Sequence, residues 1–155
     1  MTVAKDQDQL GLTEDRSDWL RRMPHAMVAT IQADGTPQVT PNWYWWDGER
    51  FWISTLDWTI KVKNLKRDPR VTLCIEEWAR RTQYVQVFGM AEVIEGDVKE
   101  TTLDLIRKYE QTEEAAQEHW EGIKEARVLI AVTPTRMQWR YDELPDTTGY
   151  HITGH

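Results

Sequence analysis

The chain has 155 residues, of which 40% are hydrophobic and 29% charged, and its net charge is −7. That length fits one domain that buries its own core without a disulfide or a structural metal, and the acidic balance argues against nucleic acid as a partner. No apolar run approaches the roughly 18 residues of a membrane-spanning helix, and the first residues, MTVAKDQDQLGLTEDRSDW, contain no apolar signal core. We therefore expect no membrane contact and a cytoplasmic location.

The first half of the chain predicts one short helix followed by strands. Thr13 is a suitable N-cap for a helix that reaches Met23. Alternating and β-branched residues predict strands over 26–31, 38–46 and 50–54, with turns at Ala33-Asp34-Gly35 and at Asp47-Gly48. Because both connections are tight, the three strands are expected to form a meander.

The second half predicts a helix over 59–67, strands over 70–77 and 83–95, a helical stretch over 97–126, and strands over 127–132 and 134–141. Gly89 interrupts one of these strands, as glycine does at a bulge. The expected fold class is mainly β (α+β): six or seven strands in a closed or nearly closed antiparallel barrel with peripheral helices. The expected organisation is a flexible segment over 1–12, the barrel domain over 13–142 and a tail over 143–155.

Nine tryptophans are unusual for this length, and three fall in the run Trp43-Tyr44-Trp45-Trp46. In a strand, alternate residues face opposite sides, so both faces of this run need to be covered. Two interpretations stay open: a heavily packed core on both faces, or one face in the core and the other against a partner subunit or a planar ligand. Cys74 lies in an apolar strand and is interpreted as a small core residue.

Several kinds of chemistry find no support in the sequence. The histidines, His25, His119, His151 and His155, do not have the spacing of a metal site, and none is expected. There is no G-x-S-x-G nucleophile motif, no Walker loop and no G-x-G-x-x-G.

Residues 54–73, STLDWTIKVKNLKRDPRVTL, carry the most information about function. A strand ends at Ser54-Thr55, and a basic helix with Lys61, Lys63 and Lys66 begins after a short loop. Unpaired N–H groups at a helix start, with hydroxyls and a lysine nearby, suit a small anion. The alternative is that these lysines only solvate a surface helix.

Five segments in order carry a family resemblance: MVATIQADGTPQVTP (27–41), WDGERFWIST (46–55), KVKNLKRDPRVTL (61–73), YVQVFGMAEVIEG (84–96) and RVLIAVTPTRMQW (127–139). With them the chain resembles the pyridoxamine-phosphate-oxidase-like split β-barrel flavoproteins, and most of all their flavin- and deazaflavin-dependent oxidoreductase branch. The resemblance implies a six-stranded split β-barrel homodimer with two cofactor sites at the subunit interface.

The resemblance also implies roles for single residues. Lys61 matches the lysine that contacts the cofactor phosphate, with Ser54 and Thr55 at the strand end before it. Gln38 and residues 40–42 match a strand that lines the flavin-type ring. The cofactor-binding residues implied in this way are Gln38, Thr40, Pro41, Asn42, Ser54, Thr55, Thr59, Lys61 and Lys63.

The implied activity is hydride transfer between the cofactor and a small or planar organic substrate. Coenzyme F420 is favoured over FMN because Thr59 stands where the family often has an arginine, and because Lys63, Lys66 and Arg67 suit an acidic tail. An FMN oxidoreductase of the same fold and a non-catalytic flavin- or haem-type binding protein are the alternatives. Water, Tyr44 or Tyr84 could supply a proton. The final residues, GYHITGH, lack the arginine-containing ending of true pyridoxamine phosphate oxidases, so that substrate is not expected.

Overall fold

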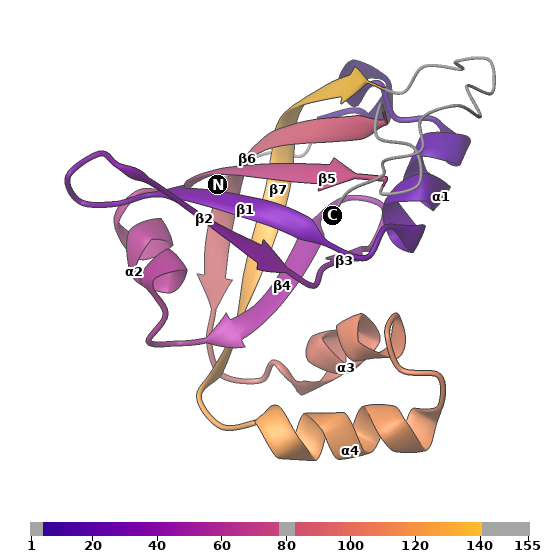
Figure 1. The fold of residues 1–155 in the computed structure, drawn as a ribbon, viewed down its shortest axis with the longest axis vertical. Helices are drawn as coiled ribbons and strands as arrows, with labels where there is room; N and C mark the ends of the chain where they lie inside the picture. Colours follow the sequence, from indigo (N-terminus) through magenta and orange to yellow (C-terminus); the bar gives the residue numbers. More distant parts are fainter. Residues whose placement is uncertain (1–4, 78–82, 141–155) are drawn as a thin grey trace, which may run out of the picture.

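The computed structural model describes residues 5–77 and 83–140 (Figure 1). Its elements in chain order are the 3₁₀ helix η1 (Gln7–Leu10), α1 (Glu14–Arg22), β1 (Ala26–Ile31), β2 (Pro37–Asn42), β3 (Trp45–Trp46), β4 (Phe51–Leu56), α2 (Ile60–Arg67), β5 (Arg70–Glu76), β6 (Tyr84–Ile94), α3 (Lys99–Arg107), α4 (Glu113–Ile123) and β7 (Arg127–Arg140). The tail predicted over 143–155 lies outside the described residues.

The expected cap and turns are present. The Thr13 hydroxyl accepts a hydrogen bond from the Arg16 amide at 3.2 Å and so caps α1. Gly35 turns the chain between β1 and β2 with a φ of 86°, a conformation that favours glycine. The Asp47 carboxylate accepts from the amides of Glu49 and Arg50 at 2.8 and 2.7 Å, which fixes the second turn.

The strands form one antiparallel sheet in the order β2-β1-β5-β6-β7-β4-β3. Its two outermost strands, β2 and β3, are joined by only Trp43 and Tyr44, so the two edges meet and the sheet curls into a split barrel. The predicted fold class is therefore confirmed. The two hairpins of the predicted meander are present as the pairs β1–β2 and β3–β4. The single strand expected over 38–46 is wrong: it breaks at Trp43 and Tyr44, so that β2 lies at one edge of the sheet and β3 at the other, and β4 also pairs with β7.

Two other boundaries differ from the sequence prediction. Residues 97–126 form two helices, α3 and α4, instead of one helical stretch. The strands expected over 127–132 and 134–141 are one strand, β7, which passes through Pro134 at a bulge opposite Gly89. A Cβ on Gly89 would lie 2.6 Å from the Thr133 carbonyl oxygen, so the predicted interruption at this glycine is confirmed as a close approach of two backbones.

The hydrophobic residues form two layers. The larger one fills the barrel and includes Tyr44, Trp46 and Phe51, all almost inaccessible to solvent. The smaller one lies between the outer face of β4 and β7 and the helix pair α3–α4, and includes Trp52 and Trp120. In Figure 1 this helix pair lies below the barrel, apart from α1.

The two faces of the tryptophan run have different surroundings. Tyr44 and Trp46 are buried in the barrel core, while Trp45 packs against the outer layer and Trp43 is 38% exposed. Tyr44 and Trp46 therefore lie in one hydrophobic layer and Trp45 against the other, and Trp43 is the residue of the run that is left partly open.

Two assignments need correction. Cys74 is half-buried on the outer face of β5, opposite the inward-facing Leu73 and Ile75, so it is not a core residue. Within the segment expected to be flexible, Leu10 and Leu12 are buried in the barrel core. The helices among the described residues are too short and too polar to cross a membrane.

Candidate functional site

The connection between β2 and β3 is held in place by the end of α3. The Lys108 ammonium donates to the carbonyl oxygens of Met23 and Tyr44 at 2.6 and 3.1 Å, and it lies 3.6 Å from the centre of the Tyr44 ring. The Tyr109 hydroxyl accepts from the Tyr44 amide at 2.9 Å. Trp43 stacks on the Tyr109 ring, with centroids 4.0 Å apart and planes within 8°. The position of Trp43 is therefore fixed on one side and open on the other.

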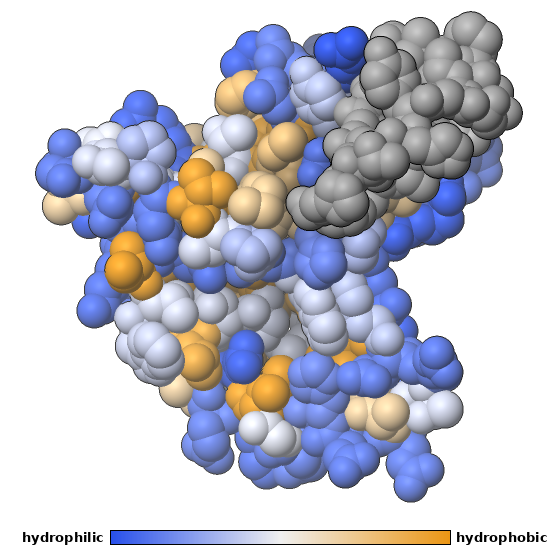
Figure 2. All heavy atoms as spheres, viewed as in Figure 1, coloured by the Kyte–Doolittle hydropathy of each residue, from blue (hydrophilic) through white to orange (hydrophobic). Residues whose placement is uncertain are grey.

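A hollow of about 350 Å³ begins at Trp43 and lies between the outer face of β4 and the helix pair. We call it the covered hollow. Its ten lining residues are Pro41, Asn42, Trp43, Ser54, Thr102, Leu105, Ile106, His119, Ile123 and Arg127. In Figure 2, hydrophobic residues (orange) lie over the barrel and along its boundary with the helix pair. This volume matches a small organic molecule.

Two hydroxyls of the covered hollow lack partners. Ser54 Oγ and Thr102 Oγ1 are the buried side-chain polar atoms for which the described residues provide no hydrogen bond. A helical threonine usually returns its hydroxyl to the carbonyl four residues earlier, which the Thr102 side chain does not do. Each unpaired buried hydroxyl costs roughly 1–3 kcal/mol. Two such hydroxyls at one hollow mark a place where a bound polar group, a water or a ligand, completes their hydrogen bonds.

His119 is the titratable side chain at the mouth of the covered hollow. Its Nδ1 lies 2.7 Å from the Glu110 carboxylate, and its ring lies 5.6 Å from Trp43. The carboxylate fixes the orientation of the imidazole, and no described residue forms a hydrogen bond with Nε2. Tyr44, which the sequence left open as a proton donor, does not face the hollow: it is fully buried, and its hydroxyl donates to the Leu20 carbonyl.

The start of α2 is the second part of the candidate site. The Thr59 hydroxyl donates to the Leu56 carbonyl and does not cap the helix, so the first amides of α2 have no side-chain partner. Lys61 is 91% buried, and no described residue pairs with its ammonium. Burial lowers the pKa of Lys61. Trp58 and Ile60 beside it are exposed by 64% and 52%.

Lys61 is therefore not the solvated surface residue of the alternative interpretation. A buried cation without a protein anion, next to free helix amides, is arranged for an anionic ligand. The exposed Trp58 and Ile60 place two apolar side chains on the surface beside Lys61.

Polar groups connect β2 and β1 to the buried face of α2. Thr30 Oγ1 donates to Gln38 Oε1 at 3.3 Å and accepts from Asn64 Nδ2 at 2.9 Å. Arg67 donates to Asn64 Oδ1 at 3.2 Å. This chain of hydrogen bonds fixes α2, and with it Lys61, on the end of the barrel.

The structure groups the predicted site residues in two places. Pro41, Asn42 and Ser54 line the covered hollow, whereas Thr59 and Lys61 lie at the start of α2. Ser54 and Thr55 are neighbours in β4 and face opposite sides of the sheet, so one flat ligand cannot contact both side chains from one side. Gln38 and Thr40 are half-buried on the inward face of β2, and Lys63 is exposed.

The other basic residues of 60–70 mostly have protein partners. Lys66 pairs with Glu95 at 2.6 Å, and Arg70 pairs with Asp68 at 2.7 Å. Lys63 is the exposed cation of α2 for which no partner is seen among the described residues.

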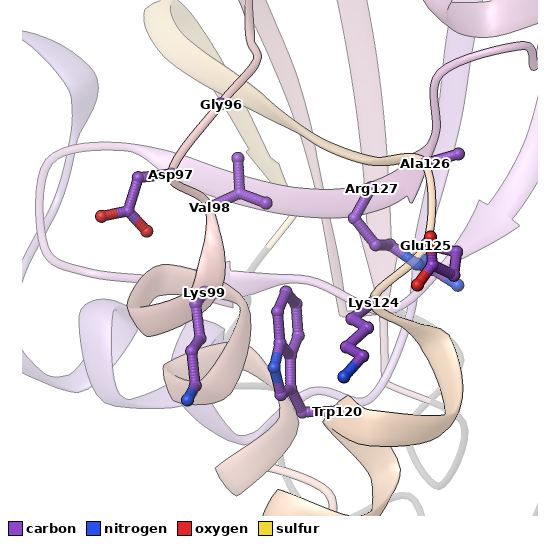
Figure 3. Close-up of a pocket in the computed structure, with 9 residues that line it drawn as sticks. All are labelled: Gly96, Asp97, Val98, Lys99, Trp120, Lys124, Glu125, Ala126 and Arg127. Carbon is purple, nitrogen blue, oxygen red and sulfur yellow. The ribbon is translucent and has the colours of Figure 1, made fainter.

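A second hollow, of about 440 Å³, lies on the other side of Arg127. Trp120 lies between Lys99 and Lys124 in Figure 3, and Glu125 lies near Arg127. Asp97 and Glu125 both line this hollow, so its charges nearly balance. No group of three metal-ligating side chains is found within 5–77 and 83–140.

Three residues of the covered hollow escaped the sequence analysis: Thr102, His119 and Arg127. They come from elements far apart in the chain, and no motif joins them. The weak signal was a threonine and a histidine on the apolar faces of amphipathic helices, a pattern equally typical of ordinary packing.

Comparison with known proteins identifies the family. The sequence profile of the family described as pyridoxamine 5'-phosphate oxidase matches residues 12–140, and the chain belongs to this family. No curated protein sequence matches.

Solved structures give the same fold. An F420 reductase is 29% identical, with a TM-score of 0.67, over 82% of this chain and 98% of that one. Rv2991 from Mycobacterium tuberculosis, described as a conserved hypothetical protein, is 25% identical, with a TM-score of 0.73, over 97% of this chain and 99% of that one. HutZ from Vibrio cholerae, described as a haem storage protein, is 18% identical, with a TM-score of 0.63, over 81% of this chain and 93% of that one, and shows the fold alone.

Proposed function

We propose that the protein is an oxidoreductase that binds coenzyme F420 and passes hydride between it and a small organic substrate. The observation that carries the proposal is Lys61, a buried ammonium without a protein partner at the start of α2. The similarity to an F420 reductase supports this choice of cofactor. Thr59, which stands where the family often has an arginine, leaves fewer fixed charges for the compact phosphate of FMN.

In this proposal, Lys61 and the first amides of α2 hold the cofactor phosphate. A charged hydrogen bond and a helix N-terminus both favour an anion there. The residues of β2 from Gln38 to Asn42 lead from this point to Trp43 and would lie along the ring. Bound there, the cofactor would supply the hydride or accept it.

The protein's own chemical contribution is then a proton. His119 lines the covered hollow, and its Nδ1–H is donated to the Glu110 carboxylate. In its imidazolium form His119 would then give its Nε2 proton to the reduced substrate and be left as the neutral imidazole. Trp43 and the apolar residues Leu105 and Ile106 keep water from the reacting atoms.

The proposal includes a homodimer. Met27 and Val39 are exposed by 41% and 52% on the outward faces of the neighbouring strands β1 and β2, and Pro41 lies opposite Met27. An apolar sheet face of this kind suits a second copy of the chain, since obligate interfaces resemble a core cut in half. Light scattering at micromolar concentration should give twice the monomer mass. A stable monomer would contradict this part of the proposal.

The test of function is a comparison of ligands. Purified protein is titrated with F420, FMN and haemin while its tryptophan fluorescence is followed. The protein is then assayed for oxidation of reduced F420 with a panel of organic acceptors. Tightest binding of F420 together with turnover supports the proposal. Tighter binding or co-purification of FMN favours the FMN alternative, and haemin binding without turnover favours a binding protein.

A further inference from the structure

We infer that the covered hollow is a binding site for a small carboxylic acid with an apolar body, recognised by Arg127 together with the hydroxyls of Ser54 and Thr102. This inference rests on the proposed function, because it names the class of substrate that the proposed oxidoreductase would bind in the covered hollow. It gives Ser54 a role toward the substrate in place of the cofactor contact that the family resemblance implies.

The first support is the charge of the hollow. Arg127 is its one permanently charged lining residue, and none of the ten lining residues is acidic; Glu125, which lies near Arg127 in Figure 3, lines the second hollow and not this one. The Arg127 Nε donates to the Ile123 carbonyl at 2.8 Å, which leaves the two terminal nitrogens for a ligand. Burial lowers the pKa of Arg127, and the guanidinium stays protonated. Two parallel N–H groups match the two oxygens of a carboxylate.

The second support is the position of the unpaired hydroxyls. Ser54 pairs with Leu129 across β4 and β7, and Arg127 pairs with Leu56, so Ser54 and Arg127 are diagonal neighbours on the outer face of the sheet. Thr102 faces them from α3, and its hydroxyl also lacks a partner. The three donors therefore converge from one strand pair and one helix on one side of the hollow.

The third support is the remaining lining. Leu105, Ile106 and Ile123 are aliphatic, and Trp43 adds an aromatic ring at the mouth. A volume of about 350 Å³ with this lining suits an aromatic or short aliphatic acid. The second hollow, with Asp97 and Glu125 in its wall, offers no comparable preference for an anion.

The test uses the full chain without any cofactor, so that its outcome does not depend on whether the protein binds F420. Isothermal titration calorimetry measures binding of benzoate, phenylacetate and cinnamate, with benzamide as the neutral analogue of benzoate. At least one acid should bind, and benzamide should bind at least tenfold more weakly than benzoate. If none of the three acids binds below about 10 mM, or if benzamide equals benzoate, the inference is wrong.

Variants locate the site. Thr102→Val and Arg127→Gln should each weaken binding of the acid by tenfold or more, whereas Lys124→Gln in the second hollow should leave it unchanged. Thr102→Val is the decisive variant because it removes an unpaired hydroxyl and should not unfold the protein. Its thermal midpoint should equal or exceed that of the parent. Undiminished binding by both hollow variants would place the acid elsewhere and overturn the inference.

Discussion

Replacing Lys61 with methionine should move stability and affinity in opposite directions. In the ligand-free protein, Lys61 is buried without a partner, and burial lowers its pKa, so its charge opposes folding. An apolar side chain of similar length should raise the free energy of unfolding by an amount on the order of 1 kcal/mol. With the cofactor bound, the ammonium contributes about 1.5–3 kcal/mol through its phosphate contact, so the variant should bind roughly 10- to 150-fold more weakly.

Two assays measure these effects on the same protein. Urea denaturation followed by tryptophan fluorescence gives the free energy of unfolding, and F420 titration gives the dissociation constant. Lys63→Met is the matched control: Lys63 lies two residues away in α2 and is exposed, so both quantities should change little. Unchanged F420 affinity of Lys61→Met would contradict the phosphate contact, and a lower free energy of unfolding would contradict the unfavourable burial of the Lys61 charge.

The remaining predictions concern the proton, the barrel and a buried lysine. His119→Gln should lower kcat for F420-dependent reduction with little change in KM, and it should remove one limb of the pH–rate profile. An unchanged profile would exclude His119 as the proton donor. Gly89→Ala should destabilise the protein by about 1–3 kcal/mol, because the new Cβ would lie 2.6 Å from the Thr133 carbonyl oxygen. Gly122→Ala should stabilise the protein by about 0.5–1 kcal/mol, because Gly122 lies in α4 with open space around it. The denaturant midpoints of the two variants check both values. Burial lowers the pKa of Lys108 from 10.5 to about 7. Between pH 7 and pH 10.5, Lys108 is therefore protonated in the unfolded chain and mostly neutral in the folded chain. The free energy of unfolding should therefore rise with pH across this window and fall as pH drops toward 7; Lys108→Met should flatten that rise, and exposed Lys99→Met should not.

The sequence predicted those parts of the fold that local chemistry decides. The Thr13 cap, the turns at Gly35 and Asp47, and the bulge at Gly89 each depend on residues close in the chain or on a steric limit. The continuous strand predicted over 38–46 failed because the break at Trp43 and Tyr44 is held by Lys108 and Tyr109, which lie more than 60 residues away and fix the backbone there. Local strand propensity does not report such a contact.

The candidate site shows the same contrast between local patterns, which the sequence reveals, and contacts that form only in the folded chain. Lys61 could be singled out because a basic helix start has a recognisable pattern. The covered hollow could not, since Ser54, Thr102 and Arg127 become neighbours only when α3 and α4 pack on the outer face of β4 and β7. Alternation in β4 does imply that Ser54 and Thr55 face opposite sides, and this could have separated their roles from the sequence alone.

Binding of a cofactor anion at Lys61 is tested by titrating the parent and Lys61→Met with F420 at one ionic strength. The parent should bind F420 more tightly than FMN, and the variant should lose at least tenfold of its F420 affinity while remaining folded. Equal F420 affinity of the two proteins, or tighter binding of FMN by the parent, would contradict these predictions.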